Sequence, residues 1–277
     1  MAITALTGST AQQTGTSPWT FSHTCHSSAT ILFIAVSFNN SQTPASASVT
    51  WNGHAMTVVH FTDAGDYCSH GLWYIASSDT GANDFVVTYS GGIAIQVCAA
   101  AFESFSGGTT VDAPASSSGA SGNLTTTAIS SATGDLVVAS GGSDDTALGS
   151  DGSQTELQYV DDAGGASVSL CSKAGAASVT LTWTGGSYAW SAGGLNVNVP
   201  AGPTIEQEGF RFRNDDGSES AATWKANQDT NITLAANTAA RIRMLLNATG
   251  DPASIGAQLE ARYKPTGGAF GPWTKVN

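Results

Sequence analysis

Short apolar runs separated by polar, glycine-rich segments recur along the chain. The run at residues 30–38 is apolar almost throughout and rich in β-branched and aromatic residues, which is typical of a strand buried on both faces. No segment has the i, i+3, i+4, i+7 spacing of a long amphipathic helix. The pattern therefore predicts an all-β protein. Further strands are expected near residues 48–51, 54–58, 71–76, 84–89, 93–105, 134–140, 156–159, 166–171, 178–183 and 188–199.

A two-residue hairpin is the most specific local prediction. Asn52 and Gly53 lie between two alternating runs, and Asn-Gly is the preferred pair of a type I′ turn because both central residues need a positive φ. A turn of this type pairs Trp51 with His54 across the hairpin.

The C-terminal part of the chain alternates in a different style. Segments near residues 208–213, 240–247 and 257–264 place apolar residues at one parity and charged residues at the other. This alternation indicates strands of a sheet with one buried face. Two shorter strands are expected near residues 230–234 and 273–276.

Charge changes abruptly along the chain, near residues 200–203. Residues 1–204 contain one basic residue, Lys173, and thirteen acidic ones, so they carry the whole net charge of −12. Residues 205–277 contain eight residues of each sign. Such a shift in composition is typical of a domain boundary.

We therefore predict two β-sandwich domains. Residues 21–200 form an acidic sandwich of jelly-roll or immunoglobulin-like type, and residues 204–277 form a small immunoglobulin-like sandwich. Residues 1–20 are polar and rich in Thr and Gly, and we expect them to be an N-terminal arm that orders only against a partner.

Composition argues against several partners. Charged residues make up 11% of the chain, whereas about 25% is usual, so Ser, Thr, Gly and Asn must cover much of the surface. An acidic body does not suit nucleic acid or an anionic membrane, because both are bound through clustered Lys and Arg. No signal peptide is visible, so we expect synthesis and folding in a cytoplasm.

Five motifs follow one another through the acidic part of the chain. They are Val-Thr-Trp-Asn-Gly at residues 49–53, Gly-Leu-Trp-Tyr at 71–74, Phe-Glu-Ser-Phe-Ser-Gly at 102–107, Thr-Gly-Asp-Leu-Val-Val at 133–138 and Ala-Gly-Ala-Ala-Ser-Val-Thr-Leu-Thr-Trp at 174–183. In this order they resemble a β-sandwich module of bacteriophage virion structural proteins and some bacterial surface proteins. Residues 207–224 resemble a C-terminal module that often accompanies it.

The resemblance implies a non-enzymatic protein displayed on a phage particle, as a capsid decoration or head-fibre component in several copies. Its partners would be other virion proteins, such as the major capsid or tail protein, and copies of itself. No catalytic residue and no cofactor comes with the resemblance. The alternative function is a tail-associated adhesin that binds glycans of the host surface.

Histidines and cysteines are the strongest candidates for metal or redox chemistry. His23, Cys25, His26, Cys68 and His70 include zinc-type ligands, but their spacing matches no zinc finger or ribbon. We favour a disulfide between Cys25 and Cys68 over a metal site. Four cysteines allow three pairings, and the sequence does not choose among them.

The remaining catalytic and calcium patterns are weak. No Gly-x-Ser-x-Gly motif is present, although Ser and His are frequent enough for a triad that is assembled only in space. Residues 214–219 carry several oxygen ligands but lack the full calcium-loop pattern, so an Asp-Gly turn is the simpler interpretation. We assign no catalytic or metal-binding residue.

Two further groups of side chains are candidates for binding. Tyr188 and Trp190 share one strand face and could stack on sugar rings if exposed, although aromatic residues within strands more often form the core. The second group consists of basic residues that could form a docking face for an acidic surface of another protein. Alternatively, these residues lie on a solvated sheet face and form ion pairs with Glu208 and Glu260. Its residues are Arg211, Arg213, Arg241, Arg243, Arg262 and Lys264.

Overall fold

The structure is a computed structural model. It describes residues 3–39, 46–65, 68–76, 79–90, 95–144, 147–161, 165–185, 188–199 and 204–214, most of 216–249, and a few positions between 260 and 275. The chain divides into two compact units, residues 1–200 and 201–277. The all-β prediction is confirmed, because every regular element in the described residues is a strand. None of these residues belongs to a helix that could cross a membrane.

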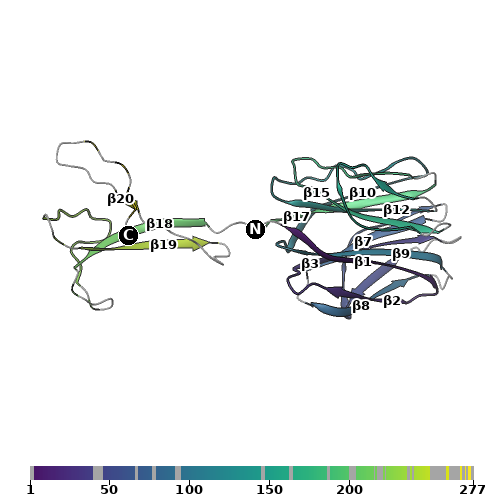
Figure 1. Ribbon diagram of the computed structural model, residues 1–277, viewed down its shortest axis with the longest axis horizontal. Coiled ribbons are helices and arrows are strands. Elements are labelled where there is room, and N and C mark those ends of the chain that lie inside the picture. Colours follow the sequence, from purple (N-terminus) through teal and green to yellow (C-terminus); the bar gives the residue numbers. More distant parts are fainter. Residues whose placement is uncertain are drawn as a thin grey trace. The chain divides into compact units, whose positions relative to one another are not determined.

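Four antiparallel sheets make up the larger unit (Figure 1). Sheet A has the order β1 (Thr4–Gly15), β9 (Ile95–Ser106), β3 (Ile31–Asn39), β7 (Cys68–Ile75) and β6 (Thr57–Gly65). Sheet B has the order β2 (Trp19–Cys25), β8 (Gly81–Tyr89), β4 (Ala47–Trp51) and β5 (His54–Ala55). Sheet C has the order β10 (Thr110–Gly119), β17 (Trp190–Asn198), β12 (Leu136–Asp144), β15 (Ala166–Ala174) and β14 (Thr155–Asp161). Sheet D has the order β11 (Leu124–Thr125), β16 (Thr182–Thr184) and β13 (Gly149–Ser150).

Strand β3 shows how the sheets are layered. All nine of its residues are buried, which confirms the prediction of a strand covered on both faces. Since side chains alternate along a strand, Leu32 and Ile34 enter a core shared with sheet B, whereas Ile31 and Phe33 enter a core shared with sheet C. A third core, around Trp183, lies between sheets C and D. The layers therefore stack in the order B, A, C, D.

The larger unit consists of two structural repeats. Strands β1 to β9 can be matched in sequence to β10 to β17 if the short strands β4 and β5 are counted as one. With this matching, sheets A and C have the same strand order, and so do sheets B and D. The sequence retains traces of this repeat. Ser-Ser-Ala-Thr stands at residues 27–30 and again at 130–133, and Val-Thr-Tyr-Ser-Gly-Gly at 87–92 corresponds to Leu-Thr-Trp-Thr-Gly-Gly at 181–186. The predicted boundary near residue 200 agrees with the division of the chain into two units, and the larger unit contains two stacked sandwiches.

The predicted N-terminal arm is wrong, because residues 4–15 are an edge strand of sheet A. The pairing of β1 with β9 runs from Thr4 opposite Ser106 to Gly15 opposite Ile95. A side-chain contact reinforces it, since the Ser104 hydroxyl donates to the carbonyl of Thr7 at 2.9 Å. An edge strand is held mainly by backbone hydrogen bonds, so its polar sequence gives little sign of it.

The predicted hairpin is confirmed. Trp51 pairs with His54, and the two turn residues Asn52 and Gly53 have φ values of 48° and 78°. These values are those that a type I′ turn requires. Trp51 is fully buried and donates its indole N–H to the carbonyl of Asp79 at 3.2 Å.

The described part of the C-terminal unit is a two-stranded ribbon with two short additions. The ribbon consists of β18 (Thr204–Arg213) and β19 (Arg241–Thr249), and β20 (Glu260–Ala261) pairs with β21 (Thr274–Lys275). Residues 230–234 form no strand, contrary to the prediction. Because most of residues 250–277 lie outside the described part, the small immunoglobulin-like sandwich stays a prediction.

Candidate functional site

The ribbon of the C-terminal unit has one apolar and one basic face. In its register Phe210 lies opposite Met244, and Arg211 lies opposite Arg243. Side chains at successive positions point to opposite faces, so the apolar pair and the arginine pair are separated by the ribbon. The alternation predicted from the sequence therefore places Arg211 and Arg243 side by side.

A segment after β18 brings an aromatic ring to the basic face. Residues 223–229 run alongside β18, since Lys225 donates its backbone N–H to the carbonyl of Phe212 and Asp229 donates to that of Phe210. Within this segment Trp224 forms a bridge opposite Arg213. The side chain of Trp224 thus lies among the arginines rather than in a core.

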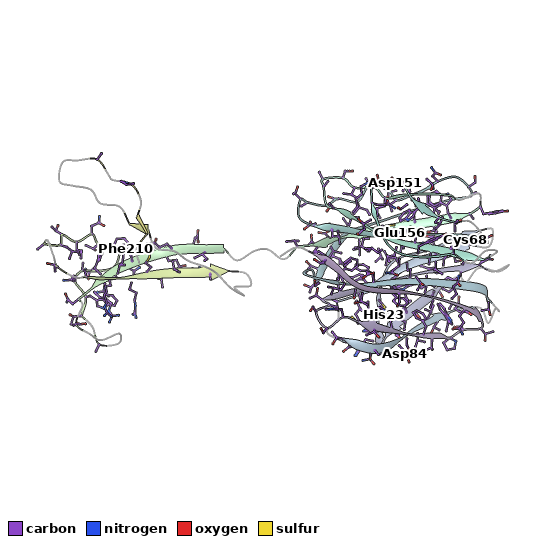
Figure 2. All side chains as sticks on the ribbon, viewed as in Figure 1. His23, Cys68, Asp84, Asp151, Glu156 and Phe210 are labelled. Atoms are coloured by element: carbon purple, nitrogen blue, oxygen red, sulfur yellow. The ribbon has the colours of Figure 1, made fainter. Side chains whose placement is uncertain are left out.

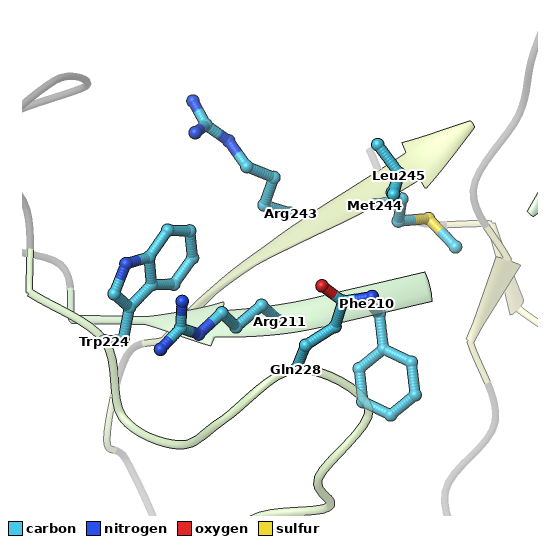
Figure 3. A pocket seen from close by; sticks show the side chains of 7 residues that line it. All are labelled: Phe210, Arg211, Trp224, Gln228, Arg243, Met244 and Leu245. Carbon is cyan, nitrogen blue, oxygen red and sulfur yellow. The ribbon is translucent and has the colours of Figure 1, made fainter. Parts of the chain in front are cut away.

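The indole of Trp224 lies among three guanidinium groups, and Figure 3 shows two of them, those of Arg211 and Arg243. The Cζ atoms of Arg211, Arg213 and Arg243 lie 4.3, 5.6 and 6.0 Å from the centroid of its ring. At these distances each cation is attracted by the negative face of the ring. Trp224 itself is 37% exposed.

A pocket of about 200 Å³ opens beside the ring. Figure 3 shows the side chains that line it: Phe210, Arg211, Trp224, Gln228, Arg243, Met244 and Leu245. On the basic face, the pocket therefore combines two cations and one aromatic ring with the exposed side chain of Leu245, a combination that suits an anionic group carried on an apolar surface.

The two guanidinium groups of the pocket have few partners of their own. The Nε–H of Arg211 donates to the carbonyl of Ala226 at 2.9 Å. Within the described residues neither Arg211 nor Arg243 forms an ion pair, and Arg243 forms no hydrogen bond. Like charges directly opposite each other across two strands destabilise the pairing, so the arrangement favours a bound anion.

The structure brings together only part of the predicted docking face, and docking itself stays a prediction. Arg241 and Arg243 are exposed and Arg211 is half-buried. Arg213 is only 4% exposed, because the segment that carries Trp224 covers it, so it is not available to a partner. Arg262 and Lys264 lie outside the described residues. No pattern in the sequence indicates that Trp224 belongs to this face.

The predicted disulfide is wrong. Cys25 and Cys68 both carry thiols. Cys25 belongs to the core between sheets B and A. Cys68, which Figure 2 labels, has its Sγ 3.8 Å from the carbonyl oxygen of Gly142 in sheet C. Sheet A therefore separates the two sulfur atoms. Burial raises the pKa of the Cys25 thiol, which makes it a poor nucleophile.

Two histidines and a serine form a hydrogen-bonded chain between sheets A and C. The Nε2 of His60 lies 3.1 Å from the Nδ1 of His70, and the Nε2 of His70 lies 3.1 Å from the hydroxyl of Ser140. Although the order resembles a catalytic triad, His70 and Ser140 are fully buried. Burial lowers the pKa of His60 to about 4 and that of His70 well below its usual value. Both histidines are therefore neutral at pH 7, and the three hydrogen-bonded side chains are part of the packing between the sheets.

His23 is a third buried histidine, with only 4% of its surface exposed. Its ring packs edge-on against Phe102, and its Nδ1 lies 2.7 Å from the hydroxyl of Ser9. Burial lowers its pKa to about 4. Within the described residues no group of three or more His, Cys, Asp or Glu side chains is arranged to hold a metal ion.

Residues 214–219, weighed as a calcium loop, are described only in part. Asp216 lies there at the surface, and its carboxylate accepts the backbone N–H of Thr223 at 3.0 Å. This hydrogen bond lowers the pKa of Asp216. The contact is that of a side chain that closes a turn.

Tyr188 and Trp190 do not form an exposed stacking pair. Tyr188 is 49% exposed, but Trp190 is only 7% exposed and belongs to the core between sheets C and D. The indole N–H of Trp190 donates to the carbonyl of Ser121 at 3.2 Å, and its ring covers Gly119. The prediction of a glycan platform from this pair is therefore wrong for Trp190.

Comparison of the chain with protein-family models, with curated proteins and with solved structures finds no match.

Proposed function

We propose that this protein is a non-enzymatic structural component of a bacteriophage particle, displayed at the surface and attached through its C-terminal unit. The acidic double sandwich is the displayed body. The basic face of the ribbon binds an acidic surface of a shell or tail protein, or of another copy of the chain.

The separation of charge within the chain supports this division of labour. The larger unit carries the whole net charge of −12, which favours solubility and keeps displayed bodies apart. Its described histidines and cysteines are largely committed to packing: His23, His60, His70, Cys68 and Cys171 are all buried. A rigid body with few reactive groups is what display requires.

The single observation that carries the proposal is the pair Arg211 and Arg243. Two guanidinium groups lie against one indole, and neither has a carboxylate partner among the described residues. Structural arginines on a solvated sheet face are usually paired or dispersed, and such exposed pairs contribute about 0–1 kcal/mol. A basic cluster left open is a complementary surface for an acidic partner.

The experiment that tests this proposal is quantitative mass spectrometry of purified particles from a host culture. Peptides of the chain at an abundance near that of the major shell protein are the expected result for a decoration component. An abundance of a few copies per particle points to a tail or fibre component instead. If particles contain no peptide of the chain, the proposal is wrong.

A polar depression on the outer face of sheet B favours glycan binding as the second candidate. Side chains with hydroxyl, amide and carboxylate groups line it, and such groups pair with sugar hydroxyls. They belong to Ser22, Asn52, Asn83 and Asp84. Binding on a glycan array that is lost in the Asn83→Ala variant is the result this function requires.

A further inference from the structure

We infer that the pocket beside Trp224 is a carboxylate-binding site, whose occupant is an Asp or Glu side chain of an acidic protein segment. The inference rests on the proposed attachment role of the C-terminal unit, and it names the chemical group that this unit takes.

The geometry of the pocket suits a carboxylate. Arg211 and Arg243 come from paired positions on neighbouring strands, so their guanidinium groups can reach one anion together. A guanidinium is planar and binds the two oxygens of a carboxylate through parallel N–H donors. Arg211 uses one donor on Ala226, and its remaining N–H groups have no acceptor within the described residues.

Trp224 fixes the position of Arg211. Stacking on its ring holds the Arg211 guanidinium in one place before a partner binds, which reduces the entropy lost on binding. The Cζ of Arg243 lies 6.0 Å from the ring centroid, at the outer limit of a cation–π contact. The contact of Arg211 with the ring is the closer of the two, at 4.3 Å. The Arg211 half of the site is therefore formed in advance.

The surroundings of the pocket favour a protein segment over a free anion. Leu245, which lines the pocket, is 50% exposed. An exposed apolar side chain next to a pair of cations matches a protein surface on which a carboxylate stands beside apolar residues. A small inorganic anion would use only the cations.

The test is the binding of a fluorescent, Glu-rich synthetic peptide with interspersed leucines to the full-length chain, followed by anisotropy. We expect saturable binding that weakens as salt is raised. Arg211→Gln and Arg243→Gln each weaken binding by about tenfold. Arg243→Lys weakens it less, because the charge is kept and the planar fork is lost.

Lys225→Gln is the matched control, because it removes one positive charge from the same unit without touching the pocket. Circular dichroism and the melting temperature of each variant show that the fold is retained. Trp224→Leu supplies a second test: it keeps both charges and lowers the affinity by removing the ring that holds Arg211.

Three outcomes would overturn the inference. They are the absence of saturable binding, an equal loss of affinity in Lys225→Gln and Arg243→Gln, and full displacement of the peptide by sulfate or phosphate at the concentration of the peptide. The experiment uses purified chain and no particles. Failure to find the chain on particles therefore leaves the carboxylate site standing, and failure of peptide binding leaves display on particles standing.

Discussion

At the scale of single residues, the packing of the two repeats depends on polar groups that the sequence pattern does not reveal as buried. His60 and His70 enter the space between sheets A and C, where Gly193 and Gly142 make room for them. A Cβ atom on Gly193 would lie 2.2 Å from the Nδ1 of His60, and one on Gly142 would lie 2.5 Å from the ring of His70. Each histidine ring thus fits against a glycine that lies far from it in the sequence.

Acid should destabilise the protein through its buried histidines. The pKa values of His23 and His60 are lowered to about 4 in the folded state, and the pKa of an unfolded histidine is about 6.5. The unfolded chain then binds protons first as the pH falls. Stability is fully present above about pH 6.5 and is lost towards pH 4, by up to roughly 1.4 kcal/mol per pH unit for each histidine.

Urea unfolding at about pH 7, 5.5 and 4.5 measures this loss. His60→Gln removes one of the titrating groups, so we expect a flatter dependence on pH than in the unchanged chain. His26→Gln is the control, because His26 is exposed. Identical dependence of stability on pH in the two variants would show that His60 does not contribute to the loss of stability in acid.

At the scale of elements, the sequence predicts the strands with apolar patterns and misses those without them. The central strand β3 and the Asn52-Gly53 hairpin follow from local residue types. The edge strands β1 and β10 are polar, and Pro114 lies within a bulge of β10. Backbone pairing with β9 and β17 stabilises these edges, and such pairing leaves no apolar period in the sequence.

Deletion of residues 1–16 distinguishes an edge strand from an arm. Because β1 pairs with β9 along most of its length, we expect the deletion to lower the melting temperature by several degrees and to promote aggregation through the uncovered edge. Differential scanning calorimetry and light scattering measure the two effects. An arm that orders only against a partner predicts an unchanged melting temperature.

The candidate site was predictable only in part at this scale. The alternation of Arg211 and Arg243 with apolar residues predicted that both lie on one face of the sheet. The contribution of Trp224 depends on the path of residues 223–229 along β18, which is a tertiary contact without a local signature. For the same reason the sequence did not reveal that Arg213 is covered.

At the scale of the whole molecule, the larger unit is two sandwiches with one shared core. Phe33 of the first repeat packs in the same cluster as Val168 and Leu195 of the second. Because neither repeat can bury this face alone, we expect the two to unfold together. The short repeated motifs, such as Ser-Ser-Ala-Thr, are the signal from which the duplication could have been predicted.

Phe33→Ala tests whether the repeats are coupled. We expect a loss of roughly 3–5 kcal/mol in the free energy of unfolding, because the change opens a cavity in the shared core. Hydrogen exchange should rise in β12 and β15 as well as in β3. Phe85→Ala, in the core between sheets B and A, is the control and should affect the first repeat more than the second. Unchanged exchange in β12 and β15 of Phe33→Ala would show that the repeats are independent.

A salt wash of particles tests whether the acidic body is attached through the basic face of the ribbon. Purified particles are washed in about 1 M NaCl, which screens charges beyond about 3 Å, and the chain is quantified by mass spectrometry in the wash and in the pellet. We expect most of the chain in the wash and the major shell protein in the pellet. Retention of the chain on the particles at this salt concentration, or its absence from them before the wash, would contradict the account.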